Sequence, residues 1–156
     1  MYVITGATGH TGSEIARKLL QSGKKVRAIS RNKNRLKSLE TQGAEIRQGS
    51  LDDSKFLADI FEGATAVYAM IPPDQSAEDL FAYMNRTGES IYKALRQSKV
   101  PNVVNLSSIG ADLPSGTGPI SGLHHQEQRE STRSERVTFT SNIFYGKFPC
   151  RHSYDP

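Results

Sequence analysis

The chain has 156 residues, of which 36% are hydrophobic, one cysteine and a formal net charge of +4. This length suits one domain with its own core, and one cysteine excludes a disulfide framework and a cysteine-based metal site within the chain. No apolar stretch approaches the roughly 18 residues of a membrane span. The first apolar segment begins at Tyr2, so we expect no signal peptide. With no disulfide framework we expect a cytoplasmic location, and we do not expect a membrane as a partner. Because the Lys and Arg residues are dispersed, we interpret the charge as a solvated surface and do not expect nucleic acid as a partner.

A glycine-rich turn follows the apolar residues 2–4 and precedes a helical pattern from residue 13. Gly6 permits a sharp turn, Gly9 removes a side chain where a diphosphate must approach, and Gly12 allows close packing of helix and strand. The free N–H groups of the helix then face the phosphates. Further residues of this turn that we expect at the cofactor are Thr8, His10 and Thr11. The alternative is a glycine-rich turn that binds no ligand.

Strand and helix patterns alternate along the rest of the chain. Predicted strands cover residues 2–4, 25–29, 44–48, 64–71 and 103–106, and predicted helices cover residues 13–21, 32–40, 52–62 and 76–97. The run at 64–71 is almost wholly apolar, which is typical of a central strand that is buried on both faces. The pattern predicts an α/β fold, a Rossmann-like doubly wound parallel sheet that is truncated after about five strands.

Ligands of such sheets bind at the carboxyl ends of the strands. At this edge we expect the glycine turn together with residues that follow the later strands. These further candidates for cofactor binding are Ser30, Arg31, Lys33, Ser50, Leu51, Asp52, Ile71, Pro72, Ser107 and Ser108. For Ser107 and Ser108 an alternative stays open, in which their hydroxyls only bond free backbone groups where the fifth strand ends.

The end of the second predicted strand favours NADP over NAD. A fold that binds NAD usually has an acidic residue here, which holds the ribose 2′-hydroxyl. This chain instead has Ser-Arg-Asn-Lys at residues 30–33. A planar guanidinium at Arg31 can hold a 2′-phosphate with two hydrogen bonds, and Ser30 and Lys33 can add contacts. The alternative is that Arg31 is an ordinary surface arginine.

These motifs resemble the NmrA-like family of atypical short-chain dehydrogenase/reductases over residues 1–129. The resemblance rests on Thr-Gly-Ala-Thr-Gly-His-Thr-Gly at 5–12, Ser-Arg-Asn at 30–32, Ile-Pro-Pro at 71–73 and Val-Asn-Leu-Ser-Ser-Ile-Gly-Ala at 104–111. It implies an NAD(P)-binding domain of an NAD(P)H-dependent oxidoreductase, whose full-length form reduces a quinone or a carbonyl-like acceptor. Two alternatives are a non-catalytic redox sensor that binds a dinucleotide and signals to a protein partner, and a nucleotide-sugar epimerase-like protein.

The resemblance leaves the catalytic residues open. Redox enzymes of the wider superfamily commonly carry Tyr-x-x-x-Lys, which this chain lacks in the expected region. His124 or His125 can replace that tyrosine as a proton donor, since imidazole titrates near neutral pH. The alternative is that both are polar residues without a chemical role. Adjacent histidines on a helix point in different directions, so we expect no metal site.

Residues 130–156 depart from the family pattern. Family members typically show an Asn-Val strand and then Leu-Arg-Pro-x-x-Phe-Met-Glu-Asn. Back-translation of residues 139–148 with a shift of one nucleotide permits Leu-Arg-Pro-Thr-Phe-Phe-Met-Glu-Asn. We therefore interpret 130–156 as an atypical, out-of-frame tail, with the substrate-binding subdomain missing and little or no activity. The tail should be loosely ordered, leaving an exposed sheet edge prone to self-association.

The frameshift hypothesis makes a prediction about the gene. The shifted methionine must be encoded by the last two bases of Tyr145 and the first base of Gly146. We therefore predict the codon TAT for Tyr145, which yields ATG in the shifted frame. Sequencing of the gene checks this, and a TAC codon would yield ACG and remove the methionine.

Overall fold

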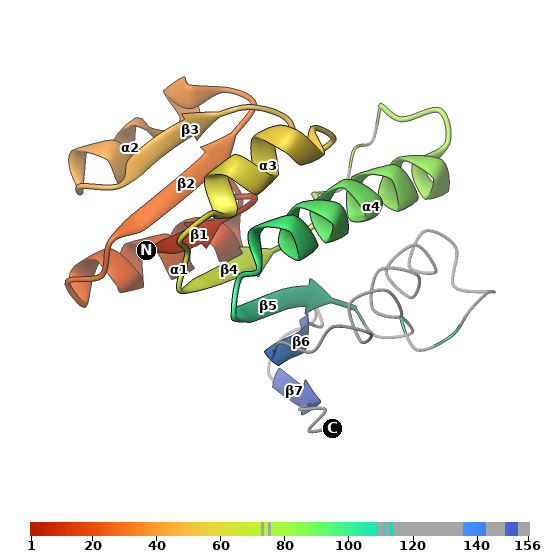
Figure 1. Cartoon of the computed structure of the whole chain (residues 1–156). Helices are drawn as coiled ribbons and strands as arrows, with labels where there is room; N and C mark the ends of the chain where they lie inside the picture. The colour runs from red at the N-terminus through yellow and green to blue at the C-terminus, as the bar shows by residue number, and fades with distance from the viewer. Residues whose placement is uncertain are drawn as a thin grey trace.

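Alternating strands and helices build one seven-stranded sheet, shown in Figure 1. The computed structural model describes residues 1–72, 74, 76–108, 111 and 113, and also the backbone of residues 136–142 and 149–152. The strands are β1 (Tyr2–Ile4), β2 (Val26–Ser30), β3 (Glu45–Gln48), β4 (Ala66–Ala69), β5 (Asn102–Ser107), β6 (Arg136–Asn142) and β7 (Pro149–His152). The helices are α1 (His10–Gln21), the 3-10 helix η1 (Lys33–Leu36), α2 (Lys37–Thr41), α3 (Ser54–Phe61) and α4 (Leu80–Ser98).

The strand order confirms the predicted doubly wound parallel sheet. The order is β3-β2-β1-β4-β5-β6-β7, and all neighbours are parallel except the pair of β6 and β7. The chain moves outward from β1 to β3 and then crosses back to β4 on the other side of β1. Val3 of β1 therefore lies between Arg27 of β2 and Val67 of β4. This reversal is the topological switch point, where ligands of such sheets bind.

Two apolar layers cover the opposite faces of the sheet. On one face α3 and α4 pack on the strands through residues such as Phe61, Ile91 and Leu95, all of which are fully buried. On the other face α1 and α2 pack through Ala16 and Leu39. Figure 1 shows α3 and α4 together in front of the sheet and α1 behind it. Buried apolar residues at helical spacing thus fix which side of the sheet each helix covers.

Capping residues set helix boundaries that periodicity alone misplaced. The side chain of Asp53 accepts hydrogen bonds from the backbone N–H groups of Lys55 and Phe56, and Asp79 accepts one from Ala82. With these caps α3 begins at Ser54 and α4 begins at Leu80, later than the predicted starts at residues 52 and 76. The predicted helix at 32–40 divides into η1 and α2. No helix in the described part of the chain is long and apolar enough to cross a bilayer.

Two further strands extend the sheet beyond the five that the sequence predicted. Residues 136–142 read Arg-Val-Thr-Phe-Thr-Ser-Asn and form β6, which pairs with all six residues of β5. Val, Thr and Phe favour strands. The local composition of residues 136–142 therefore indicates a strand, although the family pattern is lost there. Because β6 covers β5, the edge that we expected to be exposed is paired. Self-association itself stays a prediction.

Thr5 ties the carboxyl ends of β1 and β4 together at the switch point. Its Oγ1 accepts a hydrogen bond of 2.8 Å from the Met70 N–H and lies 3.2 Å from the Tyr68 carbonyl oxygen, to which it donates. The Thr5 N–H also donates to the Tyr68 carbonyl, at 3.0 Å. The side chain is fully buried. A single hydroxyl therefore fixes the position of Met70 relative to the glycine turn.

Replacement of this hydroxyl should destabilise the protein. In Thr5→Val the Met70 N–H loses its acceptor in the interior, so we expect the free energy of unfolding to fall by about 1–3 kcal/mol. Thr5→Ser keeps the hydroxyl and should lose less. Urea unfolding followed by circular dichroism measures both variants. Equal stability of Thr5→Val and Thr5→Ser would show that the hydrogen bond is not what holds the two strands.

Candidate functional site

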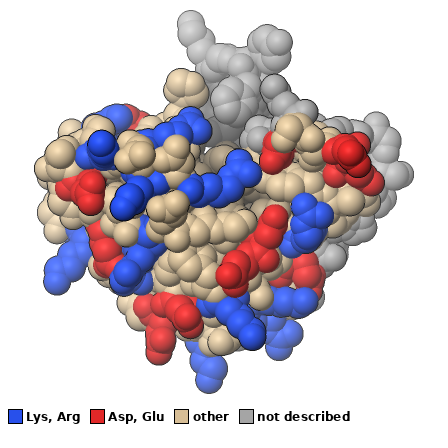
Figure 2. Space-filling model, turned by 90° about the horizontal axis from the view of Figure 1, so that it is seen from above, with Lys and Arg blue, Asp and Glu red and all other residues tan. Residues whose placement is uncertain are grey.

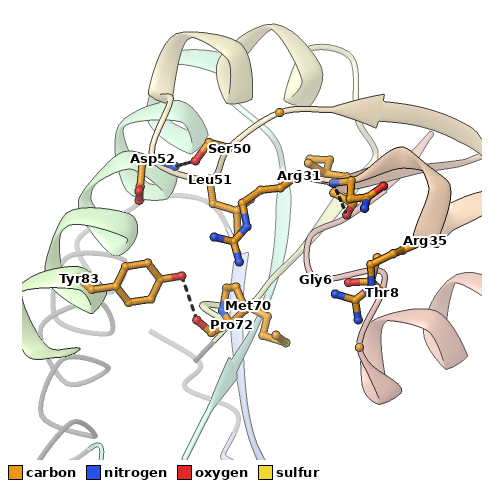
Figure 3. A pocket seen from close by; sticks show the side chains of 15 residues that line it. Gly6, Thr8, Arg31, Arg35, Ser50, Leu51, Asp52, Met70, Pro72 and Tyr83 are labelled. Carbon is orange, nitrogen blue, oxygen red and sulfur yellow. Dashed lines mark hydrogen bonds between the residues drawn. The ribbon is translucent and has the colours of Figure 1, made fainter. Parts of the chain in front are cut away.

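A cavity of about 500 Å³ opens at the carboxyl ends of β1, β2, β3 and β4. Figure 3 shows side chains from these separate segments converging on it. Nine of the predicted cofactor-binding residues line the cavity. These are Gly6, Thr8, Gly9, Ser30, Arg31, Ser50, Leu51, Asp52 and Pro72. The structure thus brings together residues that are separated by as many as 66 positions in the sequence.

The glycine turn places the start of α1 directly against the end of β1. Gly6 has a φ of +61°, which L side chains rarely adopt. A Cβ atom at Gly12 would lie 2.4 Å from the Gly6 carbonyl oxygen, so only glycine permits this packing. The first helical hydrogen bond runs from the Ser13 N–H to the Gly9 carbonyl, at 3.0 Å. The amides of residues 10–12 precede this bond and can therefore donate to an anion, as the positive end of the helix dipole favours.

Two arginines reach the cavity from the end of β2 and from η1. The Ser30 hydroxyl accepts a hydrogen bond from the Asn32 N–H, and the Asn32 side chain caps η1 by accepting one from the Asn34 N–H. This tight turn directs the Arg35 guanidinium toward the glycine turn, next to Thr8 (Figure 3). Arg31 extends further across the cavity. Both arginines start from the rim beyond β2, and a guanidinium group can bind a phosphate through two hydrogen bonds.

Carboxylate and phenol groups occupy the other side of the cavity. Asp52 follows β3 and accepts a hydrogen bond of 2.5 Å from the Thr87 hydroxyl of α4, while Arg86 lies 3.7 Å from its other oxygen. The Tyr83 hydroxyl donates to the Pro72 carbonyl oxygen at 3.0 Å. Burial raises the pKa of the Tyr83 phenol, so it stays protonated and remains a donor near neutral pH. These contacts join α4 to the segments that follow β3 and β4.

The other predicted residues do not line the cavity. His10, Thr11 and Gly12 lie in the first turn of α1, beside it, and Lys33 lies in η1. Ile71 is buried in the core under α4, and Ser107 is buried at the end of β5. Ser108 follows β5 and is also outside the lining. His124 and His125 lie outside the described residues, so their proposed chemistry stays a prediction.

Sequence reasoning missed six lining residues, namely Ile29, Asn32, Arg35, Gly49, Met70 and Tyr83. Arg35 had a partial signal, because it lies close in the sequence to the basic residues Arg31 and Lys33 that follow β2. For Gly49 only the structure shows the constraint, since a Cβ atom there would lie 2.2 Å from the Phe56 ring. Tyr83 falls inside the helix predicted at 76–97. In the structure it lies in the first turn of α4, next to the cavity, so its position depends on where the helix begins.

Charge over the molecular surface is mixed. Figure 2 shows Lys and Arg interspersed with Asp and Glu on the face seen from above, and basic side chains border a hollow near its middle. Among the described residues, no group of three or more His, Cys, Asp or Glu side chains can hold a metal ion. Among the described residues that line the cavity, the positively charged side chains are those of Arg31 and Arg35.

Comparison with protein families agrees with this geometry. A family model described as NAD(P)H-binding matches residues 6–145. The chain is 33% identical over 114 residues to Sterol demethylase protein B of Methylococcus capsulatus, covering 70% of this chain and 34% of that protein. It is 33% identical over 123 residues to Oxidoreductase ordB of Dothistroma septosporum, covering 71% and 46%. An NmrA-like family domain-containing oxidoreductase of Aspergillus hancockii, hkm9, is 41% identical over 80 residues, covering 49% and 24%. The chain thus spans less than half the length of these curated relatives.

Solved structures share the fold at lower identity. The triphenylmethane reductase of Citrobacter sp., in complex with NADP(H), superposes with a TM-score of 0.79 at 24% identity, over 93% of this chain and 50% of that one. The NADPH-dependent quinone oxidoreductase QOR2 of Escherichia coli, in complex with NADPH, has a TM-score of 0.73 at 21% identity, over 89% and 47%. Both comparisons support the Rossmann-like fold of the chain.

The two glycines at the ends of the first helical turn should respond differently to alanine. In Gly12→Ala the new methyl group meets the Gly6 carbonyl, and backbone must move, so we expect the free energy of unfolding to fall by about 1–3 kcal/mol. In Gly9→Ala the Cβ atom would lie 3.4 Å from the same oxygen, and φ is −86°, so stability should be unchanged or slightly higher. Thermal and urea unfolding of both variants tests this, and equal losses would contradict it.

Proposed function

Because the chain belongs to the NAD(P)H-binding family, we propose that its cavity binds NADP(H) as the nucleotide-binding part of an NmrA-like oxidoreductase. The observation that carries the choice of NADP(H) over NAD(H) is the pair of guanidinium groups, Arg31 and Arg35, at the rim beyond β2. No Asp or Glu occurs between residues 30 and 39, where a carboxylate would hold the ribose hydroxyls of NAD.

The residues of the cavity fit the parts of such a nucleotide. The amides at the start of α1 would hold the diphosphate, where the glycine at position 9 leaves room for it. Arg35, with Arg31 and the turn at Ser30, would hold the 2′-phosphate. The apolar side chain of Leu51 and the ring of Tyr83 would contact the adenine. Each of these groups belongs to an element whose position is fixed by the sheet or by helix packing.

We propose hydride transfer to a quinone or a carbonyl-like acceptor for the full-length form. NADPH supplies the hydride when it is bound. The support is the quinone oxidoreductase and triphenylmethane reductase names of the structural neighbours, together with the oxidoreductase names of the curated relatives. Since this chain spans about half of those structures, we expect it to bind the nucleotide and to oxidise it slowly or not at all. His124 and His125 stay our candidates for a proton donor.

Nucleotide titration tests the proposal on the chain as it is. We expect NADPH to bind more tightly than NADH in isothermal titration calorimetry. Arg31→Ala and Arg35→Ala should each weaken NADPH binding by about tenfold or more, the size of one lost charged hydrogen bond. NADH binding should change much less. Arg96→Ala is the matched control, since Arg96 lies in the last turn of α4, far along the helix from Tyr83.

The outcomes separate the alternatives. Equal affinity for the two nucleotides, or equal effects of all three arginine variants, would contradict NADP(H) specificity at this rim. A quinone added to the NADPH complex then tests the acceptor, with NADPH absorbance as the readout. Tight binding with no oxidation by any acceptor, in this chain and in a full-length relative, would favour the redox-sensor alternative.

A further inference from the structure

Arg31 forms an ion pair across the cavity with a carboxylate from another segment. Its Nη1 atom lies 3.5 Å from Oδ2 of Asp74, a residue that follows β4. In Figure 3 the Arg31 side chain extends from the end of β2 toward the side of Asp52 and Tyr83, while Arg35 stays beside Thr8. The two guanidinium groups that we assign to the 2′-phosphate therefore point to different parts of the cavity in this structure.

Asp74 is the anchored member of this pair. Its Oδ1 accepts hydrogen bonds from the Ser76 hydroxyl, at 2.6 Å, and from the Ser76 N–H, at 3.1 Å. Its side chain is 23% exposed, whereas that of Arg31 is 69% exposed. The two Ser76 hydrogen bonds, and after them the Arg31 charge, hold the pKa of the Asp74 carboxyl below its usual value. The carboxylate is thus ionised at neutral pH and fixed in place, and Arg31 is the partner that can move.

A phosphate bound near Arg31 would compete with this carboxylate. Both are anions that a guanidinium binds through the same N–H donors. An exposed ion pair contributes little free energy, so a phosphate can displace Asp74, but the displacement lowers the net affinity. The ion pair lowers the affinity for a nucleotide without a 2′-phosphate much less, because that nucleotide does not compete with Asp74 for the Arg31 guanidinium.

We propose that Asp74 is a positioning residue that sets cofactor specificity: it holds Arg31 across the cavity and so reduces the preference for NADPH over NADH. This inference rests on the proposed function. It assigns to Asp74 a role opposite to that of the arginines, since removal of its charge should sharpen their discrimination.

The substitution Asp74→Asn isolates the charge. Asparagine keeps an oxygen that can accept from Ser76, so the local turn is preserved while the ion pair is lost. We expect Asp74→Asn to bind NADPH about threefold more tightly and NADH with unchanged affinity. A threefold change corresponds to the small free energy of an exposed ion pair. The gain should shrink in high salt, which screens the ion pair. Asp74→Glu should restore the original affinity ratio. Asp59→Asn, on the exposed side of α3, is the control for the same change in net charge.

A double-mutant cycle with Arg31→Ala decides whether Asp74 acts through Arg31. If it does, Asp74→Asn has no effect on NADPH affinity in the Arg31→Ala background. A threefold gain that persists there would mean direct repulsion between Asp74 and the nucleotide, and would overturn the inference. If Asp74→Asn binds NADPH and the ratio of its NADPH affinity to its NADH affinity is unchanged, this inference is overturned and the proposed function stays intact. If the unsubstituted chain binds neither nucleotide, the proposed function fails, and this inference fails with it.

Discussion

The close approach of α1 to the end of β1 is the constraint on which the site depends. Gly12 lies so near the Gly6 carbonyl that no side chain fits between them. This contact brings the first turn of the helix, with its unpaired amides, to the edge of the sheet at the switch point. Since the helix packs on β1 through Ala16, the core holds the helix in that position. The concentration of N–H donors at the cavity is thus a result of packing.

The cavity is electrostatically divided. Arg35 lies at its rim beyond β2, and its other side carries Asp52 and the ion pair of Arg31 with Asp74. A nucleotide with phosphates at one end and a neutral base at the other suits this division, because the phosphates meet the amides and arginines. Asp52 is already engaged by Thr87 and Arg86 of α4. The acidic side is therefore held by the fold and does not add a free negative charge close to the phosphates.

Much of this arrangement could be predicted from the sequence, because it depends on local patterns. The glycine spacing at 6, 9 and 12, the strand–helix alternation and the basic residue after β2 each have a short-range physical cause. One further feature depended on where a helix begins, and two depended on distant parts of the chain. Tyr83 reaches the cavity because Asp79 sets the start of α4. Asp74 meets Arg31 only through the crossover to β4. β6 forms because β5 offers it an edge, although its residues lie outside the recognised pattern.

Among the residues that the structure describes, those that line the cavity lie between positions 6 and 83. The elements that hold these residues also lie early in the chain: Thr5 joins β1 to β4, and the cores under α1 and under α3 and α4 fix the helices. The strands β6 and β7 extend the far edge of the sheet beyond β5, away from the switch point at β1 and β4. In a doubly wound sheet the nucleotide-binding edge is built around the switch point, and the strands added at one side change the width of the sheet. The described lining of the cavity therefore comes from β1 to β4, from the segments that follow these strands, and from the start of α4.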